Sequence, residues 1–310
     1  MRLRRVIAIG AAATAVVIGT TAAVLPSSQV GRPQPLPAFT ATALAARYAT
    51  DSRMIAAAAR TASRTGNTAL AHALDGMRGH HFIDFNPRGP GLAAEVIGNL
   101  ATAKRVAILV PGSDTSLTTF DSRGTSSPQG GALALAAEAH RLDPGNHLAV
   151  IAWLGYATPG TFSPAVLTSG DAGQGASALR PLVDALARHG YQVALICHSY
   201  GSVVCGLAAP HLPVTDIAVV GSPGMDAASA GALHTTARVW AGRGASDWIQ
   251  AVPHIHLFGL GFGQDPMSPA FGARVFAAGT GGHSSYLKPG DISLRNLAYI
   301  ALGDPMAVTP

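Results

Sequence analysis

Charge is scarce in this chain of 310 residues. Charged residues make up only 12%, and lysine is almost absent. Three arginines lie within the first five residues, so the rest of the sequence is nearly neutral despite a net charge of +5. No Lys/Arg cluster with interleaved aromatic residues occurs, which argues against a nucleic-acid partner. Hydrophobic residues reach 48%, enough for one large core.

Cysteine is scarce as well. The sequence also contains no complete motif for binding a metal ion or a cofactor. The two cysteines are Cys197 and Cys205. In an exported protein they can form a disulfide, and otherwise they are small buried thiols. His254 and His256 supply only half of a metal site. The glycine-rich run 259–263 has no βαβ frame and is no dinucleotide fingerprint. We therefore expect neither a metal nor a cofactor.

The first residues are typical of an export signal. A positively charged start, residues 1–5, precedes an uncharged apolar run at residues 6–25 with small residues at 21–23. The run is also long enough to span a bilayer, so an uncleaved membrane anchor is the alternative. Both interpretations place the remainder outside the cytoplasm, in a secreted or cell-envelope location.

Composition divides the chain into three parts. Residues 1–30 are the signal peptide or anchor. Residues 31–78 contain a proline-rich linker followed by two predicted helices between 41 and 77, as a cap or a docking element. Residues 79–305 form the predicted catalytic domain.

Within residues 79–305, apolar strand-like runs alternate with helical spacing. This alternation predicts an α/β fold with a mostly parallel central sheet and helices on both faces. The predicted strands are 81–85, 93–97, 105–110, 148–153, 191–196, 217–220, 237–241 and 274–278, and the main predicted helices are 131–141, 179–186, 202–209 and 294–301.

A Cys-His-Ser-Tyr-Gly motif at residues 197–201 lies between a strand-like run and a helix-compatible run. A serine at the apex of a sharp strand–turn–helix is the nucleophile elbow of α/β-hydrolases, usually written G-x-S-x-G. Here Cys197 replaces the first glycine, and Ser199 is the candidate nucleophile.

Serine needs a base within hydrogen-bond reach, and in this fold the chain order is serine, acid, histidine. His283 follows the last predicted strand in a glycine-rich loop and is the candidate base. His254 and His256 are weaker alternatives. His198 is expected to point away from the site, because side chains alternate along a strand.

The acid should follow the strand at 237–241, where Asp247 lies. Asp265 and Asp226 are the competing candidates. For the oxyanion we expect the backbone N–H groups of Tyr200 and of Ser113, the latter in the Pro-Gly loop after the strand at 105–110.

An apolar, glycine-rich stretch between residues 249 and 271 has two interpretations. It walls an acyl pocket beside His283, or it buries its side chains on the core. Its large apolar residues are Ile255, Leu257, Phe258, Leu260, Phe262, Met267 and Phe271.

Several short segments together resemble a bacterial α/β-hydrolase family catalogued as of unknown function. The resemblance covers about residues 80–303 and implies the α/β-hydrolase fold with a triad of Ser199, Asp247 and His283. It implies no substrate. The segments are Val-Pro-Gly at 110–112, Trp-Leu-Gly-Tyr at 153–156, His-Ser-Tyr-Gly-Ser at 198–202, Gly-Ser-Pro-Gly at 221–224, Ser-Pro-Ala-Phe-Gly at 268–272 and Gly-His-Ser-Ser-Tyr at 282–286.

The chain departs from that family at two positions. Ala157 stands where relatives usually have aspartate, and Cys197 where they usually have glycine. The chain doubles back at Ser199, which puts Cys197 and Cys205 at similar depth on strand and helix. We therefore expect a disulfide that links the two.

The sequence thus predicts an exported serine hydrolase, most simply a carboxylic-ester hydrolase with a small-molecule or lipid-like substrate. Acyl transfer or amide hydrolysis by the same triad is one alternative. A non-catalytic α/β-hydrolase scaffold that acts as a binding or envelope protein is the other.

Overall fold

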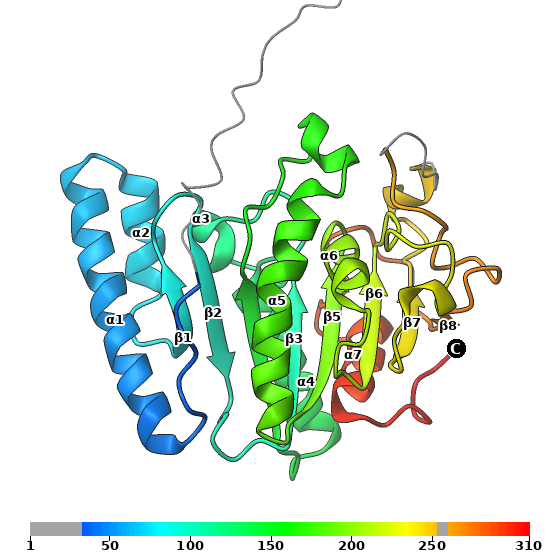
Figure 1. Cartoon of the computed structure of the whole chain (residues 1–310), viewed down its shortest axis with the longest axis horizontal. Helices are drawn as coiled ribbons and strands as arrows, with labels where there is room; N and C mark the ends of the chain where they lie inside the picture. Colours follow the sequence, from blue (N-terminus) through cyan, green and yellow to red (C-terminus); the bar gives the residue numbers. More distant parts are fainter. Residues whose placement is uncertain (1–32, 253–259) are drawn as a thin grey trace, which may run out of the picture.

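A computed structural model describes residues 33–252 and 260–310 and confirms the predicted α/β-hydrolase fold (Figure 1). One eight-stranded sheet has the order β1-β2-β4-β3-β5-β6-β7-β8. Its strands are β1 Phe82–Asn86, β2 Leu92–Ile97, β3 Arg105–Val110, β4 Leu148–Leu154, β5 Gln192–His198, β6 Asp216–Val220, β7 Arg238–Gly242 and β8 Arg274–Val275. The α-helices are α1 Ala41–Arg64, α2 Thr68–Gly76, α3 Leu117–Phe120, α4 Pro128–Leu142, α5 Gly170–Arg188, α6 Gly201–Ala208 and α7 Ile292–Leu302.

Strand direction decides where a site can form. β1 pairs with β2, and β2 with β4, in antiparallel fashion, whereas all other neighbours are parallel. The carboxyl ends of β3, β5, β6 and β7 therefore lie at one edge of the sheet. The loops that follow these strands meet there, which is the usual ligand edge of such sheets.

Apolar side chains alternate along the central strands and build a core on each face. Ile108 belongs to the cluster shared with α5 and α6, and the next residue, Leu109, belongs to the cluster shared with α4 and α7. Figure 1 shows α5 and α6 in front of the sheet and α4 and α7 behind it. Both faces are covered, as the continuous apolar strands predict.

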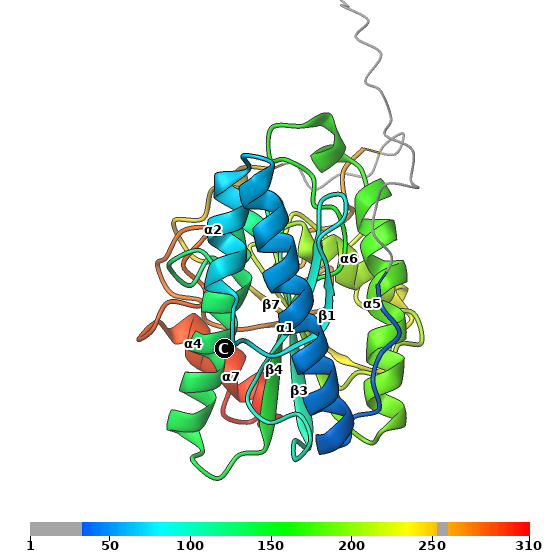
Figure 2. The same cartoon turned by 90° about the vertical axis from the view of Figure 1, so that its left-hand side faces the viewer.

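The two helices expected between residues 41 and 77 are present, and α1 covers an edge of the sheet. It packs against β1, the edge strand, and runs obliquely across that edge (Figure 2). Its Leu44 joins the core on the α5 side, whereas Ile55 joins the core on the α4 side. α1 thus covers an edge strand that would otherwise be open to pairing with another chain.

The last strand is shorter than predicted. β8 ends at Val275 instead of continuing to Ala278. The Phe276 N–H still donates to Ala241 O at 3.0 Å, but the Ala277 N–H turns to Thr309 O near the C-terminus, also at 3.0 Å. Because successive N–H groups of an extended chain point to opposite edges, the C-terminal segment lies along the edge that faces away from β7.

No helix among the described residues is long and apolar enough to cross a bilayer. Residues 6–25, the predicted signal or anchor, lie outside the described part of the chain.

Candidate active site

Ser199 lies on a sharp turn at the carboxyl end of β5. Its φ of +54° is in the left-handed region, which non-glycine residues rarely adopt. The Ser199 N–H donates to Val220 O at 3.0 Å and fixes the turn against β6. Two glycines make room for it: a Cβ on Gly112 would lie 2.7 Å from Ser199 Cβ, and a Cβ on Gly201 would lie 2.5 Å from Val110 O. The Pro-Gly loop at residues 111–112 and the elbow around Ser199 therefore pack directly against each other.

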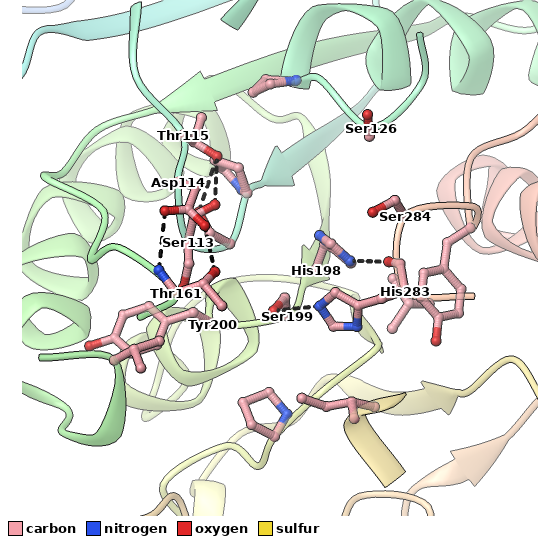
Figure 3. A pocket seen from close by; sticks show the side chains of 18 of the residues that line it. Ser113, Asp114, Thr115, Ser126, Thr161, His198, Ser199, Tyr200, His283 and Ser284 are labelled. Atoms are coloured by element: carbon pink, nitrogen blue, oxygen red, sulfur yellow. Dashed lines mark hydrogen bonds between the residues drawn. The ribbon is translucent and has the colours of Figure 1, made fainter. Parts of the chain in front are cut away.

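A continuous hydrogen-bond chain joins three of the predicted residues. Ser199 Oγ lies 2.9 Å from His283 Nε2 (Figure 3). His283 Nδ1 lies 2.9 Å from one carboxylate oxygen of Asp247 and 3.1 Å from the other. The three groups come from the loops after β5, β7 and β8, so parallel topology brings together residues that are far apart in sequence. The arrangement is that of a serine activated by an oriented base.

Asp247 is fully buried but held as a carboxylate. Burial alone would raise its pKa. Hydrogen bonds from His283, the Tyr286 hydroxyl and the Ile249 N–H, the last at 2.9 Å, outweigh burial and hold the pKa of Asp247 below its usual value. Tyr286 was not assigned a role from the sequence, although it follows His283 by three residues. Its hydroxyl also accepts from the Gly244 N–H at 3.2 Å, which fixes its position.

The competing acids have other partners. Asp265 forms an ion pair with Arg243 at 2.8 Å and accepts from the Met267 N–H. Asp226 has a left-handed φ of +55°, and its N–H donates to Phe262 O at 2.8 Å. His254 and His256 lie outside the described residues.

The expectation that His198 points away from the site is wrong. Its ring lies 4.8 Å from the His283 ring, and its Nε2 is 2.7 Å from His283 O (Figure 3). Burial and then the neighbouring His283 lower the pKa of His198 to about 4, so it is neutral at physiological pH. Alternation does hold along β5, but the loop that carries His283 packs on the same face of the sheet as His198. The histidine therefore supports that loop.

The predicted oxyanion donors, Ser113 and Tyr200, border the same cavity. Within the described residues, neither backbone N–H donates to a protein acceptor, so both remain available to a ligand. The Ser113 loop is tied to the loop after β4. Asp114 accepts from the Thr161 N–H at 3.1 Å (Figure 3), and the buried Tyr156 hydroxyl donates to Pro111 O at 2.9 Å.

Cys197 and Cys205 form a disulfide in the structure, with Cα atoms 6.5 Å apart. Both residues are fully buried, the first on β5 and the second on α6. The bond links the strand before Ser199 to the helix after it and so braces the turn. Titration of denatured protein without reductant should find no free thiol, and two thiols would contradict the pairing.

Ser199 and His283 open into a cavity of about 550 Å³. Hydroxyl groups line part of it, including Ser126 and Ser284. In the stretch between residues 249 and 271, Phe262 lines the cavity, whereas Phe271 is 1% exposed within the core. Ile255, Leu257 and Phe258 lie outside the described residues. Larger apolar lining comes from Phe162, Val166, Leu167, Trp248, Ile249 and Val252. Among the described residues, no group of His, Cys, Asp and Glu is arranged to hold a metal ion.

Fold and site together define an α/β hydrolase. A family model described as "Alpha/beta hydrolase" matches residues 86–257, more than half of the chain, and the chain belongs to this family.

Its curated relatives include two uncharacterized proteins of Mycobacterium tuberculosis, from strains CDC 1551 / Oshkosh and H37Rv. Each is 34% identical over 256 residues, 69% of this chain and 37% of the relative. The chain thus spans little more than a third of the length of these relatives.

Solved structures with a similar fold include dienelactone hydrolase from Anabaena variabilis, 17% identical with a TM-score of 0.47, covering 71% of this chain and 93% of that one. A serine hydrolase without lid from Xanthomonas campestris is 17% identical with a TM-score of 0.41, covering 71% and 92%. Similarity at this level carries no argument about activity.

Proposed function

We propose that the protein is an exported serine hydrolase that cleaves carboxylic esters through an acyl-enzyme. The observation that carries the proposal is the unbroken hydrogen-bond chain from Ser199 Oγ through His283 to Asp247, beside an apolar cavity. The buried carboxylate of Asp247 bonds to the imidazole of His283, which in turn bonds to Ser199 at the apex of the elbow. This is the arrangement that makes serine nucleophilic.

In the first half-reaction, Ser199 Oγ attacks the ester carbonyl carbon while His283 Nε2 takes its proton. Asp247 accepts from Nδ1–H, fixes the tautomer and stabilises the imidazolium. The N–H groups of Tyr200 and Ser113 donate to the carbonyl oxygen as it becomes negative. The bond to the alkoxy oxygen then breaks, and the imidazolium gives its proton to the departing alcohol.

In the second half-reaction, water replaces the alcohol. His283 Nε2 takes a proton from the water, which attacks the acyl carbon. The bond to Ser199 Oγ breaks, the serine regains the proton, and the carboxylic acid leaves. An alcohol or amine in place of water would give acyl transfer, so product analysis with and without added alcohol separates the two outcomes.

The cavity favours short or medium acyl chains. Residues 221–237, the segment between β6 and β7, are too few for a lid domain and contain one 3-10 helix, Gly231–Leu233. Along a p-nitrophenyl ester series we expect kcat/KM to be highest at short or medium chains. Cleavage of long chains alone would contradict this.

Hydrolysis of p-nitrophenyl butyrate tests the proposed chemistry. We expect Ser199→Ala to reduce kcat by about 10⁴-fold or more, because only the oxyanion donors and substrate binding would remain to accelerate the reaction. Ser126→Ala, which removes a hydroxyl that borders the cavity but not the hydrogen-bond chain, is the matched serine control. Equal rates for wild type and Ser199→Ala would refute the mechanism.

Export is part of the proposal and rests on the charged start and apolar run of residues 1–30. Expression of the full chain in a bacterial host should place the protein outside the cytoplasm. N-terminal sequencing of that product distinguishes a cleaved signal from a retained anchor, and a purely cytoplasmic product would contradict export.

A further inference from the structure

Large hydrophobic side chains that are exposed gather around the mouth of the cavity. Phe162 is fully exposed, and Leu167, Trp248 and Leu260 are each about half exposed. We call these four residues the apolar rim. The other exposed large hydrophobic side chains of the described residues are Leu133, Val275 and Met306, none of which borders the cavity. Exposed apolar surface of this kind marks an interaction site when it is contiguous.

The four rim residues surround one opening. Phe162, Leu167 and Trp248 line the cavity itself. Leu260 adjoins Leu167, because the N–H of the next residue, Gly261, donates to Leu167 O at 3.1 Å. The Trp248 ring lies 4.5 Å from the ring of His283, so the rim begins directly at the reacting groups. Figure 1 shows the loop before α5 and the loop after β7 projecting at the same end of the sheet.

The segments that carry the rim contain no charged residue. They are residues 157–169, 248–252 and 260–264. Of the charged groups near these segments, Asp114 accepts hydrogen bonds from Thr161, and Arg243 pairs with Asp265 at 2.8 Å. A surface of this kind offers nothing to an acidic or basic partner. It suits an uncharged or zwitterionic apolar phase, into which aromatic and aliphatic side chains can insert.

We propose that the apolar rim docks the protein on a lipid surface, from which esters enter the cavity directly. This inference rests on the proposed ester hydrolysis. A protein seated on the rim would close the mouth of the cavity, because rim residues form that mouth. A lipid surface would instead bring its ester molecules to Ser199. The lipid surface is therefore the occupant consistent with an active site at the centre of the rim.

Vesicle flotation tests docking independently of catalysis. The probe is phosphatidylcholine vesicles, and the protein is residues 31–310 carrying Ser199→Ala, so that a predicted N-terminal anchor does not contribute. We expect this protein to float with the vesicles. Phe162→Ser with Leu260→Ser should weaken partition by at least about tenfold, since each change withdraws a large apolar side chain. Met306→Ser, at a side chain that is 92% exposed but distant from the cavity, is the matched control.

Catalysis by the active protein gives the second measurement. For each variant, the rate on an ester dispersed in vesicles is divided by its rate on a soluble short-chain ester. We expect this ratio to fall in Phe162→Ser/Leu260→Ser and to be unchanged in Met306→Ser. Because flotation uses the Ser199→Ala protein, docking without any hydrolysis would refute only the proposed function.

Two results would overturn the docking proposal. One is no flotation of the starting protein, or equal flotation of the rim and control variants, while soluble esters are still cleaved. The other is loss of binding to a protein partner or to a second copy of the chain in the rim variants, with flotation unchanged. Thermal melts of each variant ensure that a loss of binding is not a loss of fold.

Discussion

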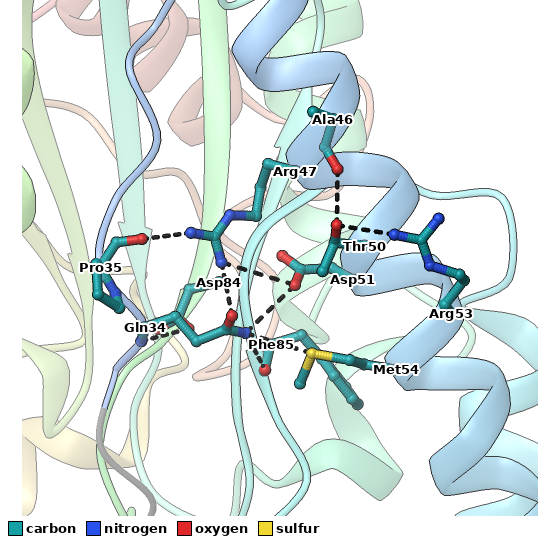
Figure 4. A network of polar contacts seen from close by, with 10 residues as sticks. All are labelled: Gln34, Pro35, Ala46, Arg47, Thr50, Asp51, Arg53, Met54, Asp84 and Phe85. Carbon is teal, nitrogen blue, oxygen red and sulfur yellow. Dashed lines mark hydrogen bonds and ion pairs between the residues drawn. The ribbon is translucent and has the colours of Figure 1, made fainter.

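Two clusters of buried carboxylates in this molecule have opposite acid–base behaviour. At the candidate active site, three donors hold the pKa of Asp247 below its usual value. At the other cluster, Asp51 of α1 and Asp84 of β1 surround Gln34 of the N-terminal segment (Figure 4). There burial raises both pKa values to about 6, with hydrogen bonds from Gln34 and the charge of Arg47 opposing it.

The pKa values of the two clusters differ because of their hydrogen-bond donors and not because of burial, since Asp247 and Asp51 are both fully buried. Asp247 receives a hydrogen bond from the Ile249 N–H at 2.9 Å besides those of His283 and Tyr286. Asp51 receives one from Gln34 Nε2 at 3.3 Å, and Arg47 lies 3.9 Å away. Hydrogen-bond donors around a buried carboxylate favour its charged form and lower its pKa, whereas burial with few donors favours the protonated form and raises the pKa. The first cluster holds the proposed catalytic residues, and the second joins the N-terminal segment to the sheet.

The largest expected effect comes from removing the charge of Asp247. Asp247→Asn keeps the shape but favours the wrong tautomer of His283, so kcat for ester hydrolysis should fall by about 10⁴-fold. Asp184→Asn, on the surface of α5, is the charge-matched control and should leave kcat unchanged. A loss of tenfold or less for Asp247→Asn would mean that another group orients His283.

At the second cluster, Gln34 is the central group. Its Nε2 donates to Phe85 O at 2.6 Å, and its Oε1 accepts from Arg47 at 2.7 Å. Gln34→Ala removes both of these hydrogen bonds and should lower the free energy of unfolding by about 2 kcal/mol. Urea unfolding measures this, with the exposed Gln192→Ala as control, and kcat should not change. A fall in kcat without loss of stability would mean that the Gln34 cluster acts on the candidate active site, which would contradict the separation of the two clusters.

The pH dependence of stability should have opposite signs at the two clusters. The folded pKa of Asp84 is about 6, above the usual value of 3.8. Its contribution is therefore fully present below pH of about 4 and is lost as the pH rises through about 6. The contribution of Asp247, whose folded pKa is lowered, is present above pH of about 4 and is lost as the pH falls through that lower value.

Asp84→Asn isolates the first of these contributions. At pH 8 it should raise the free energy of unfolding by about 1–2 kcal/mol, since the wild type must bury a charge there. The gain should shrink toward zero by pH 4, where the wild-type side chain is protonated. Urea unfolding at several pH values measures it, and a difference that is constant from pH 4 to 8 would contradict the assignment.

The smallest expected effect comes from removing one of the hydrogen-bond donors to Asp247. Tyr286→Phe removes one hydrogen bond to the carboxylate, so kcat/KM should fall about tenfold. With fewer donors, the carboxylate stabilises the His283 imidazolium more strongly, so the acid limb of the pH–rate profile should move to higher pH. A purely structural role would lower activity without moving this limb. Tyr299→Phe on α7 is the control.

Topology made most of the site predictable. In a parallel sheet the loops after successive strands meet at one edge, so the elbow motif, the position after a strand and the chain order selected Ser199, Asp247 and His283, which the structure brings together. Residue spacing alone did not exclude Asp265 as the acid. Its ion pair with Arg243 depends on how the loops fold.

The parts that sequence reasoning missed depend on contacts between distant segments. The role of Tyr286 and the position of His198 beneath His283 follow from how the loop after β8 packs. The contact between Ala277, just past the end of β8, and Thr309 near the C-terminus also joins segments with no shared local pattern. The cluster around Gln34 joins residues that are 50 positions apart, such as Gln34 and Asp84, and has no local pattern.

Labelling with a fluorophosphonate probe tests the central claim most directly, because the probe reacts only with a serine activated by its neighbours. Wild type and Ser199→Ala are treated in parallel, and the labelled peptide is identified by mass spectrometry. We predict one adduct per chain, on Ser199 in the wild type and absent in Ser199→Ala. Equal labelling of the two proteins, or no labelling of folded wild type, would contradict the assignment of Ser199 as an activated nucleophile.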